Sequence, residues 1–229
     1  MGANKVMITI DLEDWFQVEN FKNCIPFSRW SDMEQRFEYS TRNLLKIFDE
    51  KSIKATFFIL GWNAEQAPGF SITEQAIMHL KEIGFTYDSS YNNFGFNHRH
   101  GKIDLTQYNK KLLAYRDSEG FWELPISNLS IGKIIFPWWG GGYFRLLNKT
   151  LFRCGVKRIM SKESGYMFYA HPWEIDPEQP RVKEAGLFFR FRHYLNLRKF
   201  KDRLYSFIES FQDCSFVTCS QYINFLENK

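Results

Sequence analysis

Short strand-like segments, most of them largely apolar, alternate with longer amphipathic ones along this 229-residue chain, and this alternation limits the fold more than any other feature. Residues 6–11 and 55–60 are apolar, β-branched runs with the length of buried strands. Further strand candidates are residues 87–90, 121–126, 166–170 and 216–218. Because strand-like segments alternate with helical ones, the sequence predicts an α/β fold with mainly parallel strands.

Helical segments follow both of the first two strand candidates. Ser31 with Glu34, and Ser71 with Glu74, have the spacing of capping boxes, so we expect a helix to begin near each pair. Apolar residues recur at helical spacing after both pairs, and Gly84 would end the second helix. A third, long amphipathic helix is expected over residues 197–211.

Composition narrows the class of protein. Hydrophobic residues make up 44% of the chain and charged residues 24%, and neither a repeat nor a long linker divides it, so we expect a single domain over residues 1–229. A net charge of +4 is too weak for a nucleic-acid face, and the apolar runs are too short to span a membrane. No signal peptide is visible, and the four cysteines lack the spacing of a metal site. We therefore expect a cytoplasmic protein with reduced thiols.

An acidic cluster follows the first strand candidate. Asp11 and Glu13 would lie on one side of the strand, and Asp14 would open the following loop. Carboxylates at the carboxyl end of a parallel strand suit a general base or a hard cation. The alternative is equally open: a helix N-cap with solvated acids beside it.

A second cluster follows residues 166–170. His171 could protonate a leaving group there, and Trp173 could wall a pocket or stack on a sugar ring. A structural histidine is the alternative reading. Residues 190–194, which are basic and aromatic, would either contact an acidic glycan or phosphate or form a solvated face.

Residues 138–145 combine three glycines with aromatic side chains. The glycines allow close backbone approach, and Trp139 and Tyr143 could line a substrate groove. A tight structural turn is the competing interpretation. The segment lacks the Lys-Ser/Thr pair of a phosphate-binding loop, so nucleotide binding is not expected.

Taken together, these segments resemble the polysaccharide deacetylases of the NodB-homology group, also called carbohydrate esterase family four. The likeness is greatest to the branch found in exopolysaccharide gene clusters. It extends from about residue 6 to about residue 200 and is carried by residues 8–17, 54–62, 67–73, 85–90, 140–146, 171–174 and 190–197.

The resemblance implies a distorted (β/α) barrel and metal-dependent removal of acetyl groups from sugars. By position, Asp11 would be the general base and His171 the acid, and Glu13 or Asp14 would bind a Zn²⁺-like ion, with Glu13 preferred. The substrate would be an acetylated glycan or oligosaccharide, contacted by the aromatic side chains of Trp15, Trp139, Tyr143 and Trp173.

The sequence departs from this family where the family has its metal-binding His-x-x-x-His pair. Residues 62–66 run directly into Ala67, so one to two β/α units, on the order of 60 residues, are missing. Gln66 replaces the arginine that braces the base in the family, and His98 and His100 do not match the motif. One acidic ligand cannot hold a catalytic zinc, which normally has three protein ligands.

Two functions therefore stay open. The first is an N-deacetylase of surface or exopolysaccharide metabolism, which recruits other ligands such as His98 or His100 or works without a tightly bound metal, as an allantoinase-like amidohydrolase would. The alternative is an inactive relative that binds a glycan or a protein partner. A homodimer that completes the interrupted sheet is a further hypothesis.

Overall fold

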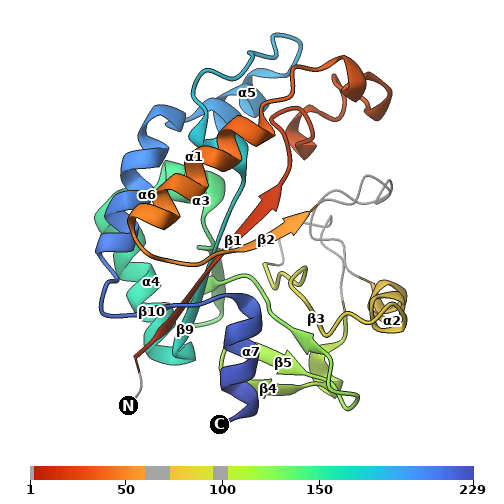
Figure 1. The fold of residues 1–229 in the computed structure, drawn as a ribbon, viewed down its shortest axis with the longest axis vertical. Coiled ribbons are helices and arrows are strands. Elements are labelled where there is room, and N and C mark those ends of the chain that lie inside the picture. Colours follow the sequence, from red (N-terminus) through yellow and green to blue (C-terminus); the bar gives the residue numbers. More distant parts are fainter. Residues whose placement is uncertain (1–2, 60–72, 95–102) are drawn as a thin grey trace.

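The computed structural model describes residues 3–59, 73–94 and 103–229, which form a mixed α/β fold (Figure 1). The strands are β1 (Lys5–Leu12), β2 (Thr56–Ile59), β3 (Tyr87–Asp88), β4 (Asn109–Lys111), β5 (Ala114–Arg116), β6 (Trp122–Glu123), β7 (Asn128–Ile131), β8 (Ile134–Pro137), β9 (Gly165–Ala170) and β10 (Ser215–Phe216). The α-helices are α1 (Phe37–Glu50), α2 (Glu74–Glu82), α3 (Gly141–Leu146), α4 (Lys149–Glu163), α5 (Leu187–Tyr194), α6 (Phe200–Glu209) and α7 (Cys219–Glu227). Short 3₁₀ segments are η1 (Glu19–Phe21), η2 (Phe27–Asp32), η3 (Leu105–Gln107), η4 (Pro172–Ile175) and η5 (Leu197–Lys199).

Strand β1 is the centre of the main sheet, and every strand that pairs with it is parallel to it. One edge of β1 pairs with β9 over most of its length. The other edge pairs first with β10 and then with β2. The carboxyl ends of β1, β2 and β9 therefore meet at one end of the sheet, as the sequence predicts for parallel strands.

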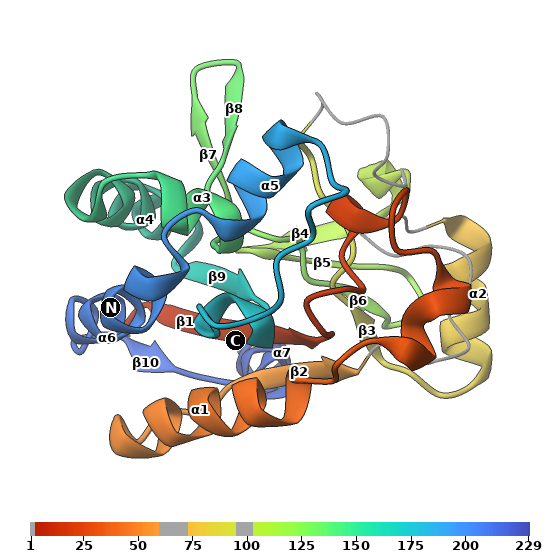
Figure 2. The same cartoon turned by 90° about the horizontal axis from the view of Figure 1, so that it is seen from above.

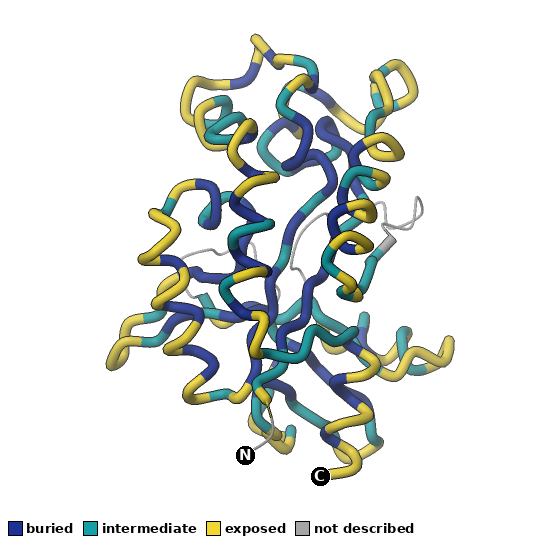
Figure 3. Tube along the Cα trace, turned by 60° about the vertical axis from the view of Figure 1, so that its left-hand side comes forward, coloured by how far each residue is buried: buried dark blue, intermediate teal, exposed yellow. Residues whose placement is uncertain are grey.

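The core lies on both faces of β1, which explains why the middle of this strand is largely apolar. Val6, Ile8 and Ile10 pack with side chains of α1, α4 and α6 on one face. Met7 packs on the other face with Trp122 and residues of α7. Figure 3 shows the corresponding column of buried backbone through the middle of the molecule.

Two smaller sheets flank this core. One has the strand order β3-β6-β5-β4, and the other is the hairpin β7–β8. The hairpin projects from the body of the molecule (Figure 2) and leaves Ile131 and Ile134 exposed. No helix in the described ranges is long and apolar enough to cross a bilayer.

Of the two expected helix starts, the first is wrong, and the second is confirmed in its position. Helix α1 begins at Phe37 rather than near Ser31, because residues 27–32 form η2 and the carboxylate of Asp14 accepts the Arg36 and Phe37 N–H groups. Helix α2 begins at Glu74 and is capped by Thr73, whose hydroxyl accepts the Ala76 N–H. Ser71 lies outside the described residues.

The predicted end of the second helix is confirmed. Gly84 follows the last residues of α2 with a φ of +90°, a left-handed conformation that side chains disfavour. The third helix is shorter than expected. It is divided into η5 and α6, and α6 ends at Glu209.

Candidate acid–base site at the ends of β1 and β9

Pairing between β1 and β9 brings two distant sequence segments together. Ile10 lies opposite Ala170 in the parallel register, so Asp11 and His171 both follow directly from paired positions. The candidate base and the candidate acid, 160 positions apart in the chain, thus lie at the same end of the sheet.

The hydroxyl of Tyr169 connects these two side chains. It donates a hydrogen bond of 2.9 Å to Oδ2 of Asp11 and lies 2.6 Å from Nε2 of His171. Burial, with the negative charge of Asp11 beside it, raises the pKa of Tyr169 well above its ordinary value. The hydroxyl therefore stays protonated at neutral pH and can relay a proton between the two groups.

Two carboxylates enclose the imidazole of His171. Nε2 lies 2.8 Å from Oε1 of Glu13, and Nδ1 lies 3.4 Å from Oε2 of Glu174. Burial opposes a charge on the ring, but the attraction and hydrogen bonds of Glu13 and Glu174 outweigh it and raise the pKa of His171 to about 10. His171 is therefore an imidazolium at neutral pH and holds a proton to donate.

Asp11 has the opposite role in this charge arrangement. Burial raises its pKa to about 6, and the nearby His171 cation limits that rise. An aspartate with such a pKa is ionised at neutral pH yet more basic than an exposed one, which suits a general base.

A buried ion pair holds Glu174 in place. Nε of Arg145 lies 2.8 Å from Oε1 of Glu174, and Nη1 donates to the carbonyl oxygens of His193 and Leu195, each at 2.7 Å. Burial favours the neutral acid, but the positive charge of Arg145 outweighs it and lowers the pKa of Glu174. Glu174 therefore remains a carboxylate beside His171, whose backbone N–H it also accepts.

The three glycines of residues 140–142 are the N-cap and the first two residues of α3, which begins against this ion pair. Gly140 has a φ of +132° and pairs with Tyr169, and a Cβ there would lie 2.3 Å from the Tyr169 carbonyl oxygen. Gly141 has a φ of +50° and lies against the carboxylate of Glu174. These glycines thus allow the start of α3 to approach β9, and Arg145 of the same helix lies next to Glu174.

A family model described as "Domain of unknown function (DUF3473)" matches residues 89–224, more than half of the chain. The chain belongs to the DUF3473 family. Domains of this family occur in polysaccharide deacetylase-like proteins. No curated protein matches the sequence. The DUF3473 match includes Arg145, Tyr169, His171 and Glu174, whereas Asp11 and Glu13 precede it.

The aromatic side chains expected to bind substrate in this DUF3473 protein are largely enclosed. Trp173 stacks on His171 with ring centroids 5.3 Å apart, and it is only 5% exposed. Trp15 is 4% exposed and donates its indole N–H to the carbonyl oxygen of Glu34. These two tryptophans belong to one apolar cluster.

Trp139 and Tyr143 belong to a second cluster, where their rings meet edge to face at 5.1 Å. Tyr143 is half-buried, and Trp139 is 9% exposed. The four aromatic residues thus belong to two separate clusters, and Trp173 stacks on the candidate acid His171.

The candidate metal ligands Glu13 and Asp14 do not fit an ion that needs three protein ligands. Oδ1 of Asp14 accepts the Trp15 N–H, and Oδ2 accepts two N–H groups at the start of α1, so both oxygens have donors. Glu13 pairs with His171. Within residues 3–59, 73–94 and 103–229, no group of three His, Cys, Asp or Glu side chains is placed to hold an ion. His98, His100 and Gln66 lie outside those ranges.

Three residues of the site were not predicted from the sequence. Tyr169 precedes His171 by two positions and so shares its face of the chain, which is a usable signal. Glu174 stands in the same short motif as His171. Arg145 carries no comparable signal, because its role depends on a contact with Glu174, 29 positions away.

Proposed function

We propose that this DUF3473 protein is a polysaccharide deacetylase-like hydrolase that removes N-acetyl groups from a glycan of surface or exopolysaccharide metabolism. The observation that carries the proposal is the pairing of Asp11, whose pKa is about 6, with His171, whose pKa is about 10, through the hydroxyl of Tyr169. Two groups whose environments separate their pKa values in this way are suited to act as base and acid.

The proposed reaction begins with a water molecule that loses a proton to the carboxylate of Asp11. The resulting hydroxide attacks the carbonyl carbon of the acetyl group and forms a tetrahedral intermediate. As the carbon–nitrogen bond breaks, His171 gives its Nε2 proton to the departing nitrogen. The products are the free amine of the sugar and acetic acid.

Recovery of the starting state needs one proton transfer from Asp11 to neutral His171. The hydroxyl of Tyr169 contacts both groups, so it can donate its proton to His171 and take one from Asp11. Glu13 and Glu174 favour this return, because they stabilise the imidazolium form of His171.

We also propose the finer family assignment. The all-parallel pairing of β1 with β2, β9 and β10 is compatible with a distorted (β/α) barrel of the NodB-homology type that lacks one to two β/α units. A cytoplasmic location and a homodimer that completes the sheet belong to the same proposal.

The resemblance assigns the polarisation of the acetyl carbonyl to a Zn²⁺-like ion. Glu13 would be its acidic ligand in this chain. Because the described side chains are poorly placed to act as ligands of such an ion, each proton transfer above is assigned to the chain's own side chains.

The engagement of both Asp14 oxygens favours a second candidate function. Without a complete set of metal ligands, the protein would bind an acetylated glycan or a protein partner and leave the glycan unchanged. The enclosed aromatic clusters would then support the fold.

Acetate release from N-acetylated oligosaccharides by the purified protein tests both functions. The proposal expects release that falls on the order of 100-fold in Asp11→Asn and in His171→Gln. His79→Gln is a matched control, because His79 is exposed on α2. Absence of acetate release together with saturable binding of the same oligosaccharides would contradict hydrolysis and support the binding function.

A further inference from the structure

Helix α5 presents its apolar side chains to solvent. Leu187, Phe188 and Phe191 are 81%, 69% and 61% exposed, and Leu187 is the most exposed large hydrophobic side chain in the described part of the chain. At helical spacing these three side chains lie on one face of α5. A face of this kind marks an interaction surface more often than an ordinary solvated one.

The opposite face of α5 is anchored, so this apolar face cannot turn inward. His193 is fully buried, its ring stacks on Trp173 at 4.2 Å, and Nε2 lies 2.7 Å from Oε1 of Gln179. The end of α5 is also held by Arg145, whose guanidinium donates hydrogen bonds to the carbonyl oxygens of His193 and Leu195. These contacts therefore hold α5 with its apolar face toward solvent.

Positive charge is concentrated in the sequence segment that contains this apolar face. Residues 181–199 contain six basic residues and one acidic residue, Glu184, which gives +5, while the whole chain carries +4. The rest of the chain therefore has a net charge of −1. The six basic residues are Arg181, Lys183, Arg190, Arg192, Arg198 and Lys199.

Two of these basic residues lie at the edges of the apolar face of α5. On the helical wheel, Arg190 lies on one side of the apolar face and Arg192 on the other. All six basic residues are at least partly exposed. An apolar face edged with arginine is the pattern of helices that lie in the interface of an anionic bilayer.

We propose that α5 and its basic flanks, residues 181–199, dock on the surface of a membrane that contains anionic lipid. Leu187, Phe188 and Phe191 would enter the headgroup region, and the surrounding arginine and lysine side chains would contact lipid phosphates. A protein partner fits less well, because residues 181–199 combine a small apolar centre with a net charge of +5 and hold one acidic residue of their own, Glu184, with Glu178 paired to Arg198 beside them.

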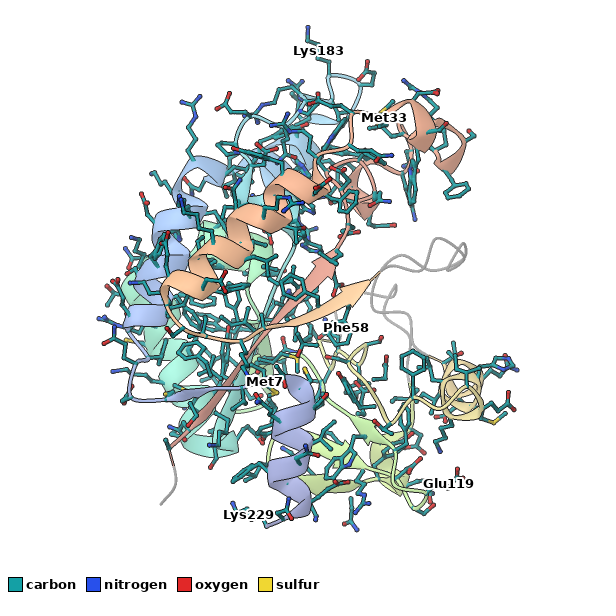
Figure 4. The ribbon with its side chains drawn as sticks, in the orientation of Figure 1. Met7, Met33, Phe58, Glu119, Lys183 and Lys229 are labelled. Atoms are coloured by element: carbon teal, nitrogen blue, oxygen red, sulfur yellow. The ribbon has the colours of Figure 1, made fainter. Side chains whose placement is uncertain are left out.

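Docking in this way would bring the candidate site close to the bilayer. His193 of α5 stacks on Trp173, which stacks on His171, so the apolar helix and the acid–base pair belong to one packed unit. Figure 4 places Lys183 at the extreme end of the molecule, beyond the carboxyl end of β1. A glycan held at a membrane surface would lie within the same region. The docking itself does not depend on the proposed hydrolysis.

Flotation of the purified protein with vesicles tests the proposal. We expect binding to vesicles of phosphatidylcholine and phosphatidylglycerol in equal parts, and weak binding to phosphatidylcholine alone. Phe188→Ser with Phe191→Ser should lower the bound fraction about tenfold. Arg190→Glu with Arg192→Glu should have a similar effect, and added salt should weaken wild-type binding.

Ile131→Ser with Ile134→Ser is the matched control, because these side chains are also exposed but lie on the β7–β8 hairpin. This variant should bind as the wild type does, and thermal unfolding should show that all variants are folded. The proposal would be overturned if the wild-type protein did not bind anionic vesicles, or if the control variant lost as much of its bound fraction as the Phe188 and Phe191 variant. A dimer in solution that the Phe188 and Phe191 changes dissociate would overturn it as well, since a second copy would then cover the face.

Discussion

Nε2 of His171 lies 2.8 Å from Oε1 of Glu13, so an ion pair joins the residues that directly follow the paired strands β9 and β1. The side chains are 15% and 10% exposed, which limits screening by water. This contact makes the stability of the protein depend on the charge of His171.

We expect the protein to lose stability as the pH rises from about 6.5 to about 10. The folded state raises the pKa of His171, so its contribution is complete below 6.5 and disappears as pH passes the folded value. The loss should be on the order of a few kcal/mol, because one pKa unit corresponds to about 1.4 kcal/mol. Urea unfolding across this range measures it. His171→Gln should remove the pH dependence, and His79→Gln should preserve it.

Tyr169→Phe should remove the hydroxyl that connects Asp11 and His171 and keep the ring that packs beside them. The hydroxyl donates to Asp11, and this hydrogen bond lowers the pKa of Asp11, so its loss should raise that pKa above about 6. In the acetate-release assay, the acidic limb of the pH–rate profile should then shift to higher pH, with a rate loss on the order of 10-fold or more. An unchanged limb with an unchanged rate would remove Tyr169 from the mechanism.

The fold was predictable where the signal is local, and β1 is the clearest example. Its apolar residues, such as Met7 and Ile8, lie on both faces because both faces are covered, so a short sequence window is sufficient. The start of α1 was not predictable in this way. Its cap is Asp14, 22 positions before Arg36, and no spacing rule connects the two residues.

The site shows the same division. Asp11 and His171 each stand at the end of a recognisable strand, so their types and positions could be identified before their proximity was known. Arg145 could not, because a buried arginine acquires its function from the partners that the fold supplies, here Glu174 and two carbonyl oxygens of residues 193 and 195.

Asp14→Ala should destabilise the protein through α1 rather than through a metal site. The change removes the acceptor of the Arg36 and Phe37 N–H groups, and loss of such a cap costs about 0.5–2 kcal/mol. Asp14→Asn retains an acceptor oxygen and should lose less. Equal unfolding free energies for Asp14→Ala and the wild type would contradict the capping role.

Isothermal titration with Zn²⁺ separates the metal ligands that the resemblance implies from the contacts that the site contains. Since Asp14 has donors on both oxygens and Glu13 pairs with His171, we expect no tight site of one ion per chain. One tightly bound ion, lost in Asp11→Ala with Glu13→Ala, would instead mean that residues outside the described ranges complete the site. His98→Ala and His100→Ala would then identify them.

Glu123→Gln should become more favourable as the pH rises. Glu123 is fully buried, and burial, together with the charge and hydrogen bond of the neighbouring Asp88, raises its pKa well above 4.5. A raised folded pKa gives stability that is present at low pH and lost as the carboxyl is forced to ionise. Glutamine cannot ionise, so the difference in unfolding free energy between Glu123→Gln and the wild type should shift in favour of the variant above pH 4.5.

Glu119→Gln, at an exposed position, should show no such trend. A constant difference between Glu123→Gln and the wild type from acidic to neutral pH would mean that Glu123 ionises as readily in the folded protein as in the unfolded chain.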